Sequence, residues 1–162
     1  WPICLAAMWL GKAMADTDLK TIQTAIEARL KSEMSYLKAV GPLGDVLAKN
    51  LPDEYLILCP SVHVTFYSGS FRKVGVSSDL HDNTLTWHFF VIGRSYVSTV
   101  KLLQGSGSTK GIYEILDDLY ECMNGTDLSL GIWPFTPGEL VQEHLDKNVA
   151  IYSWLFTTER RV

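Results

Sequence analysis

Two stretches of the chain repeat their apolar residues at the spacing of an α-helix. The first covers about residues 17–34, with apolar positions at Leu19, Ile22, Ala25, Ile26 and Leu30. The second follows a glycine-rich segment, with apolar positions at Ile112, Ile115, Leu116, Leu119 and Met123. Each set falls on one stripe of a helix, so both are predicted to be amphipathic helices packed on a core. Asp16 or Thr17 is expected to cap the first, and Asn124-Gly125 to end the second.

Other stretches alternate apolar and polar residues, as half-buried strands do. They are residues 60–67 and 84–92, and a C-terminal pair, residues 139–145 and 149–156, joined by a tight turn. Residues 84–92 become apolar on both faces, which places this strand near the middle of a sheet. Gly93 is expected to form a bulge, after which residues 94–100 continue the strand. The end of the chain, from Thr157, is expected to lie outside the sheet.

Less regular segments lie between these elements. Residues 36–40 predict a short strand broken by Gly41-Pro42, and residues 43–51 predict a short helix. Residues 68–83 follow neither period and predict a long exposed loop or a loose hairpin arm, of the kind that is usually functional or mobile.

The order of these elements predicts the fold class. Helix, strand, long loop, strand, helix and hairpin are typical of an α+β sandwich, with a mostly antiparallel sheet and two main helices packed on one face. Residues 16–162 are expected to form a single domain. Residues 1–15 are apolar but too short to span a bilayer, so we interpret them as an extraneous or disordered segment ahead of a natural start at Met14.

The composition of the chain argues against several classes of function. The net charge is −4 without a block of like charges, which disfavours gripping nucleic acid. The three cysteines are far apart and the four histidines show no ligand spacing, so no metal site and no cofactor are expected. His63 and His88 could face one another across the sheet, but no nucleophile signature accompanies them, so the chain is not expected to be an enzyme.

The segment from Gly105 to Gly111 leaves an alternative open. A glycine-rich loop that runs into a helix N-terminus can hold a phosphate, but this one is neither Gly-x-Gly-x-x-Gly nor followed by Gly-Lys-Ser/Thr. A flexible connection, with Ser108 or Thr109 capping the helix, is the favoured interpretation.

Dense aromatic residues suggest assembly with other subunits. The set is Trp87, Phe89, Phe90, Trp133, Phe135, Tyr152, Trp154 and Phe156. Several fall on both faces of their strands, while helices can cover only one face. We therefore expect another subunit to bury part of the second face.

Several short motifs together resemble a known family. They are Ile22, Ile26, Arg29 and Leu30 in the first helix, Cys59 to Val64, Gly107, Gly111 and Tyr113, Leu119 to Gly125, and Ile151 to Thr157. This pattern resembles the Mu-like prophage protein family encoded ahead of the tail sheath, which is similar to the tail terminator proteins of long-tailed phages. The resemblance covers about residues 16–160.

The resemblance implies a non-enzymatic virion subunit of a contractile tail, located in the tail or neck and assembled in the bacterial cytoplasm. Such a subunit forms a ring, expected to be a hexamer, that caps the tail tube and sheath and joins them to the head connector while DNA passes through. The contacts are expected at Phe71, Arg72, Lys73 and Val74. Two alternatives stay open: a head–tail adaptor or completion protein, and a small nucleotide- or phosphate-binding protein that uses the loop from Gly105 to Gly111.

Overall fold

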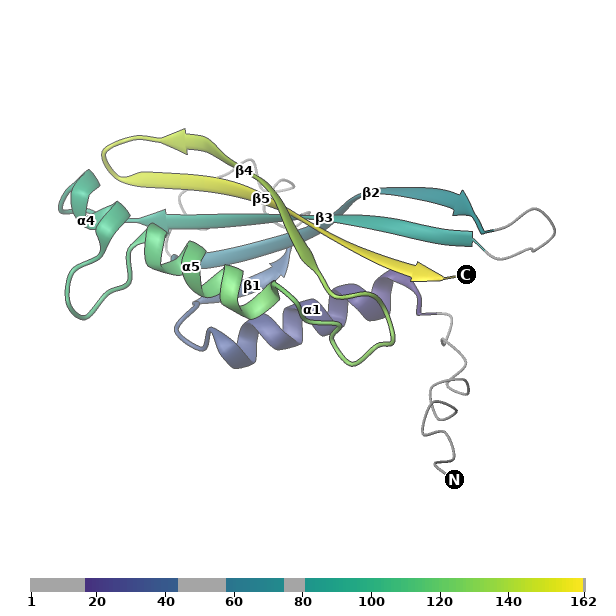
Figure 1. Ribbon diagram of the computed structural model, residues 1–162. Helices are drawn as coiled ribbons and strands as arrows, with labels where there is room; N and C mark the ends of the chain where they lie inside the picture. Colours follow the sequence, from purple (N-terminus) through teal and green to yellow (C-terminus); the bar gives the residue numbers. More distant parts are fainter. Residues whose placement is uncertain (1–16, 44–57, 75–80, 162) are drawn as a thin grey trace, which may run out of the picture.

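A computed structural model describes residues 17–43, 58–74 and 81–161 (Figure 1). These residues contain the helices α1 (Leu19–Glu33), α4 (Thr99–Gln104) and α5 (Ile112–Met123). They also contain the strands β1 (Ala39–Pro42), β2 (Ser61–Lys73), β3 (His81–Arg94), β4 (Thr136–Leu145) and β5 (Val149–Arg161). Residues 1–15 and nearly all of the short helix expected over residues 43–51 lie outside the described residues.

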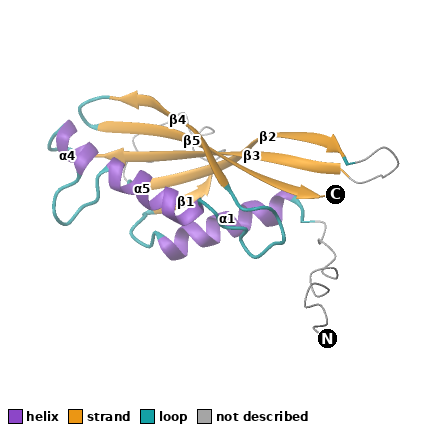
Figure 2. Ribbon diagram, in the orientation of Figure 1, coloured by secondary structure: helices purple, strands orange, loops and turns teal. Residues whose placement is uncertain are grey.

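The five strands form one sheet in the order β1-β2-β3-β5-β4. The pairing of β1 with β2 is parallel, and the other three pairings are antiparallel. As expected, β3 is the central strand. Both main helices lie on the same face of this sheet (Figure 2), so the predicted α+β class with a mostly antiparallel sheet is confirmed.

The cap of the first helix is Asp18, which lies one residue after Thr17 and two after Asp16. Asp18 has an extended backbone and its Oδ1 atom accepts a hydrogen bond from the Thr21 N–H at 2.6 Å, which satisfies a donor of the first turn. Thr17 instead donates its hydroxyl to the carbonyl of Leu130. The prediction of the cap was therefore wrong, although the buried face of Ile22, Ile26 and Leu30 follows the expected period.

The core lies between the sheet and the two main helices. β3 contributes Leu85, Trp87, Phe89 and Val91, all at most 1% exposed. In the adjacent strand, Phe156 pairs with Trp87 and Trp154 with Phe89, and the rings of Phe89 and Phe156 are 5.1 Å apart.

Most of the aromatic residues of the strands therefore lie on the helix face, where α5 also places Tyr113 and Tyr120 against Tyr152 and Trp154. Of the strand aromatics that suggested a second aromatic face, only Phe90 points to the face away from the helices, beside His88. The expectation of an extensively aromatic second face was wrong.

Several boundaries also differ from the predictions. Gly41 and Pro42 do not break β1 but belong to it, which an edge strand permits. Gly93 forms no bulge and pairs in register with Ala150. A Cβ atom at Gly93 would lie 2.4 Å from Ile112 Cδ1, so the glycine allows α5 to approach the strand closely. β3 ends at Arg94, and Ser98 caps α4 where a continued strand was expected.

Candidate assembly surface

The paired end segments of three neighbouring strands form what we call the arm. It consists of residues 68–73 of β2, 81–86 of β3 and 157–161 of β5, paired through to Lys73↔His81 and Asp82↔Arg161. The expected loose loop or hairpin is thus a regular sheet extension, with only residues 75–80 outside the described residues. The expectation that the chain end leaves the sheet was wrong, because β5 runs to Arg161.

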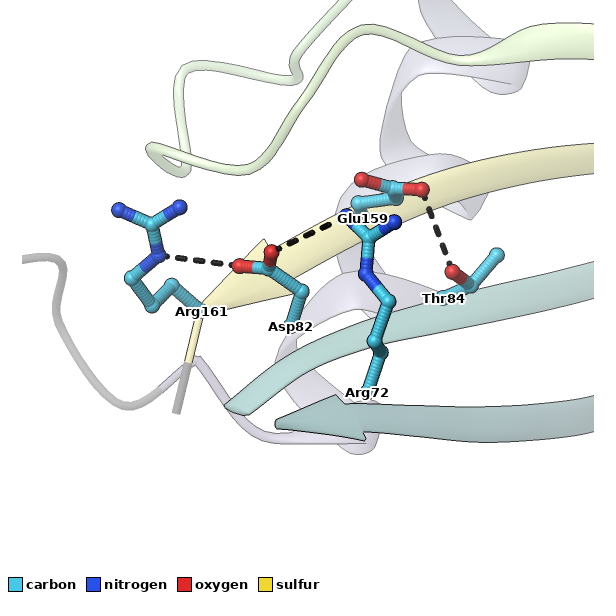
Figure 3. A network of polar contacts seen from close by, with 5 residues as sticks. All are labelled: Arg72, Asp82, Thr84, Glu159 and Arg161. Carbon is cyan, nitrogen blue, oxygen red and sulfur yellow. Dashed lines mark hydrogen bonds and ion pairs between the residues drawn. The ribbon is translucent and has the colours of Figure 1, made fainter. Parts of the chain in front are cut away.

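A row of alternating charges crosses the end of the arm (Figure 3). Arg72, Asp82 and Arg161 lie opposite one another in register on three adjacent strands. Asp82 Oδ1 accepts from Arg161 Nε at 3.0 Å, and Asp82 Oδ2 lies 3.5 Å from Arg72 Nη2. The hydrogen bond from Arg161 holds the pKa of Asp82 below its ordinary value, and Arg72 adds to the effect. These contacts tie the last strand residues to the arm.

The base of the arm is fastened to the rest of the fold by β5. The Trp133 N–H donates to the Glu159 carbonyl at 2.7 Å, and the Thr158 hydroxyl donates to the Trp133 carbonyl. Arg160 donates to the carbonyl of Thr17, just before α1. The arm is therefore an ordered extension of the core.

The contact residues predicted from sequence lie at the tip of the arm. Phe71 pairs with Asn83 on the face opposite the charged row, and 67% of the Phe71 side chain is exposed. Arg72 and Lys73 end β2, and Val74 follows it. Their role in assembly stays a prediction. Sequence reasoning missed Asp82 and Arg161, because their proximity depends on the register of three strands.

The outer edge of the arm is open within the described residues. β1 pairs with β2 only from Ser61 to Val64, so no described strand flanks β2 from Thr65 to Lys73. Such an edge presents backbone N–H and C=O groups that another chain can pair with.

The helix stripe and the glycine-rich loop have structural roles. Ile112, Ile115, Leu116, Leu119 and Met123 are all at most 6% exposed. Neither Ser108 nor Thr109 caps α5: the cap position is Gly111, whose N–H donates to Glu114 Oε2 at 2.8 Å. The carboxylate of Glu114 thus already uses the backbone N–H at the cap of α5, where an anion could otherwise bind.

The remaining amides of this loop are largely used within it. The N–H groups of Gly105, Ser106, Ser108 and Thr109 donate to carbonyls of the loop itself or of α4. A Cβ atom at Gly111 would lie 2.2 Å from Gly105 N, so this glycine permits a close backbone approach. The geometry gives no support to a phosphate cradle built from backbone amides.

The candidate catalytic groups are not assembled into a site. His63 pairs with Phe90 and Thr65 with His88, so the two histidines share a face without lying directly opposite. Burial lowers the pKa of His88 and raises the pKa of Cys59 to about 11, which keeps that thiol protonated at neutral pH. Within residues 17–43, 58–74 and 81–161, no three metal-ligating side chains gather.

No helix in the described part of the chain has the length and apolar character needed to cross a bilayer. Comparison with protein families identifies the one described as Bacteriophage Mu, Gp37, whose model matches residues 18–159. The chain belongs to this Gp37 family. The match begins at Asp18, the cap of α1, and ends within β5, so it includes every described element. No curated protein matches the chain.

Membership of the Gp37 family confirms the resemblance to a Mu-like phage family. It indicates that the chain is a structural protein of a phage or prophage-derived particle.

Proposed function

We propose that this chain is the tail terminator of a contractile tail. In this proposal six copies form a ring in the neck of the virion, cap the tail tube and sheath, and present a surface to the head connector. The observation that carries the proposal is the ordered three-stranded arm, which leaves Phe71 exposed and β2 without a flanking strand among the described residues, in a member of a Mu phage family.

The arm has the properties that an assembly contact needs. Its base is hydrogen-bonded to the core through Thr158 and Arg160, so little conformational freedom is lost when it docks. Phe71 offers an aromatic anchor of the kind enriched in interfaces, and Arg72 and Lys73 surround it with charge. We place the contact with a neighbouring subunit or with the tube at Phe71, Arg72, Lys73 and Val74.

The experiment that tests this function removes the gene from the phage or prophage and examines the tails by electron microscopy. A terminator stops growth, so its loss should yield tubes and sheaths of variable, excessive length without heads, and the wild-type gene should restore uniform tails. Tails of normal length that fail to join heads would instead identify a head–tail adaptor. Complete infectious particles would refute both roles.

The phosphate-binding alternative can be tested directly. Because Glu114 and the loop carbonyls already use the amides around Gly111, calorimetry with nucleotides and inorganic phosphate should detect no binding. Micromolar binding that is abolished by Gly107→Val would restore that alternative.

A further inference from the structure

A basic groove lies where the first strands begin and β3 ends. Its volume is about 860 Å³, and its lining includes Lys38, Cys59, Arg94, Lys101 and the loop from Gly105 to Lys110. Lys38 directly precedes β1, Arg94 ends β3, and Lys101 belongs to α4. Three elements distant in sequence therefore bring cations to one concave surface of a protein whose net charge is −4.

Of the four cations that line the groove, Lys110 pairs with Asp118, and the other three have no carboxylate partner among the described residues. The ion pairs among the described residues involve Arg72, Lys110, His144 and Arg161, and none involves Lys38, Arg94 or Lys101. The Arg94 guanidinium lies 4.3 Å from the centre of the Tyr96 ring, and its Nε atom has no hydrogen-bond partner among the described residues. The one carboxylate among the described lining residues, Glu114, caps α5. The groove therefore has unused positive charge.

The opposite edge of the sheet carries the complementary charge. Every residue of β4 except Pro137 is exposed. The strand and its turn contain three acids, Glu139, Glu143 and Asp146, and one lysine, Lys147. Exposed apolar side chains accompany these acids, with Leu140 44% and Val141 38% exposed. The rim of the groove has the same mixed character, because Val97 is 70% exposed.

The β4–β5 turn and the adjoining end of β4 lie at the same height along the strands as the groove, whereas Glu139 lies further along β4, next to the Leu140↔Trp154 pair. Arg94 of the groove pairs with Val149, directly after the β4–β5 turn, and the Ser95 N–H donates to the Asn148 carbonyl at 2.9 Å. Lys38 and Pro60, which precede β1 and β2, lie at this end too, whereas β4 forms the far edge of the sheet. A contact between them joins two different surfaces of neighbouring copies, and such a head-to-tail contact forms a ring when the rotation between neighbours closes.

We propose that the acidic β4 edge of one subunit docks against the basic groove of the next. The occupant is thus a second copy of this chain, bound through carboxylates of Glu139 and Glu143 to Lys38, Arg94 and Lys101. This contact deepens the proposed ring and rests on it. Duplex DNA suits the groove poorly, since it needs many clustered cations along a surface.

Charge reversal tests the contact. The groove variant is Lys38→Glu with Lys101→Glu, and the strand variant is Glu139→Lys with Glu143→Lys. Within the described part of the chain, Glu143 is the one of these four residues with a side-chain hydrogen bond, which it accepts from Ser153, so thermal unfolding is measured alongside. Exposed residues of α1 supply a control with the same charge change, Lys20→Glu with Lys31→Glu.

Assembly is measured by sedimentation velocity and by binding to tails from a strain that lacks the gene. Each reversal should weaken assembly by on the order of 100-fold, because like charges then meet across the contact. The fourfold variant should recover to within roughly tenfold of wild type, and the α1 control should assemble normally. When both reversed chains are folded, mixing them should restore assembly, because the unchanged acidic strand of the groove variant meets the unchanged basic groove of the strand variant.

The outcomes separate the two proposals. If wild-type rings form and both reversals assemble like wild type, the groove contact is wrong while the terminator role stands. If the fourfold variant fails although it is folded, the groove contact is also wrong. If wild-type chains form no ring in solution or on tails, the proposed function itself fails and this contact fails with it.

Discussion

Phe71→Ala should separate assembly from folding. Phe71 lies at the tip of the arm, 67% exposed, and its partner in the pairing is Asn83. Because so little of the ring is buried in the single subunit, its removal should change the free energy of unfolding by less than about 0.5 kcal/mol. The variant chain should therefore fold and unfold like wild type.

The effect of Phe71→Ala on the assembly of subunits into a ring should be much larger. A phenylalanine side chain buries about 200 Å² when fully covered, and the 67% still exposed leaves roughly 130 Å² for a neighbour to cover. At about 25 cal/mol per Å² this amounts to about 3 kcal/mol per contact, a factor of about 150 in the association constant. In a ring, the loss is repeated at every interface.

The assay combines sedimentation velocity over a concentration series with urea unfolding of the monomer. Phe71→Leu is the matched control, because it keeps an apolar anchor and should retain most of the assembly. The reasoning is refuted if Phe71→Ala forms rings of subunits or caps tails at wild-type concentrations. The exposed Phe71 side chain would then contact no neighbour.

Three further predictions concern the subunit itself. Trp87→Ala should lower the free energy of unfolding by about 3–5 kcal/mol; Trp87→Phe should cost only about 1 kcal/mol, because the indole N–H has no acceptor among the described residues and its removal offsets part of the cavity. Urea unfolding measures both, and equal losses would contradict this. Gly111→Ala should lower the free energy of unfolding by about 1–3 kcal/mol, because the new Cβ atom would lie 2.2 Å from Gly105 N. An unchanged melting temperature would contradict this prediction. The pKa of Asp82 is lowered in the folded chain, so its stabilising effect is present above the unfolded pKa of about 4 and is lost as pH falls through the lower folded value. The difference in stability between wild type and Asp82→Asn should be constant above about pH 5 and shrink below about pH 4. A difference that grows on acidification would contradict a lowered pKa of Asp82 in the folded chain.

Local periodicity predicted the elements wherever one face is buried by the core. Ile22, Ile26 and Leu30 repeat with the helix because α1 lies on the sheet, and Leu85, Trp87 and Phe89 alternate because β3 has one face beneath the helices. The part of the arm that belongs to β2 gave no such signal. Residues 67–73 of β2 are exposed on both faces, so alternation confers no advantage there, and their strand structure comes from pairing with β3.

The loop from Gly105 to Gly111 shows why composition alone left the phosphate-binding alternative open. Glycines before a helix serve either a bound phosphate or a tight backbone turn, and both need the same residue. Only the position of Glu114, which accepts from the Gly111 N–H, distinguishes the two.

The sequence by itself determined the α+β class, the two amphipathic helices, the central strand and the phage family, because these depend on residue spacing along the chain. The tertiary structure alone decided the row of Arg72, Asp82 and Arg161, the basic groove and the acidic edge of β4. Each of these depends on strand register or on the meeting of distant segments. Register is fixed by the whole packed sheet, and no local pattern encodes which charge will lie opposite which.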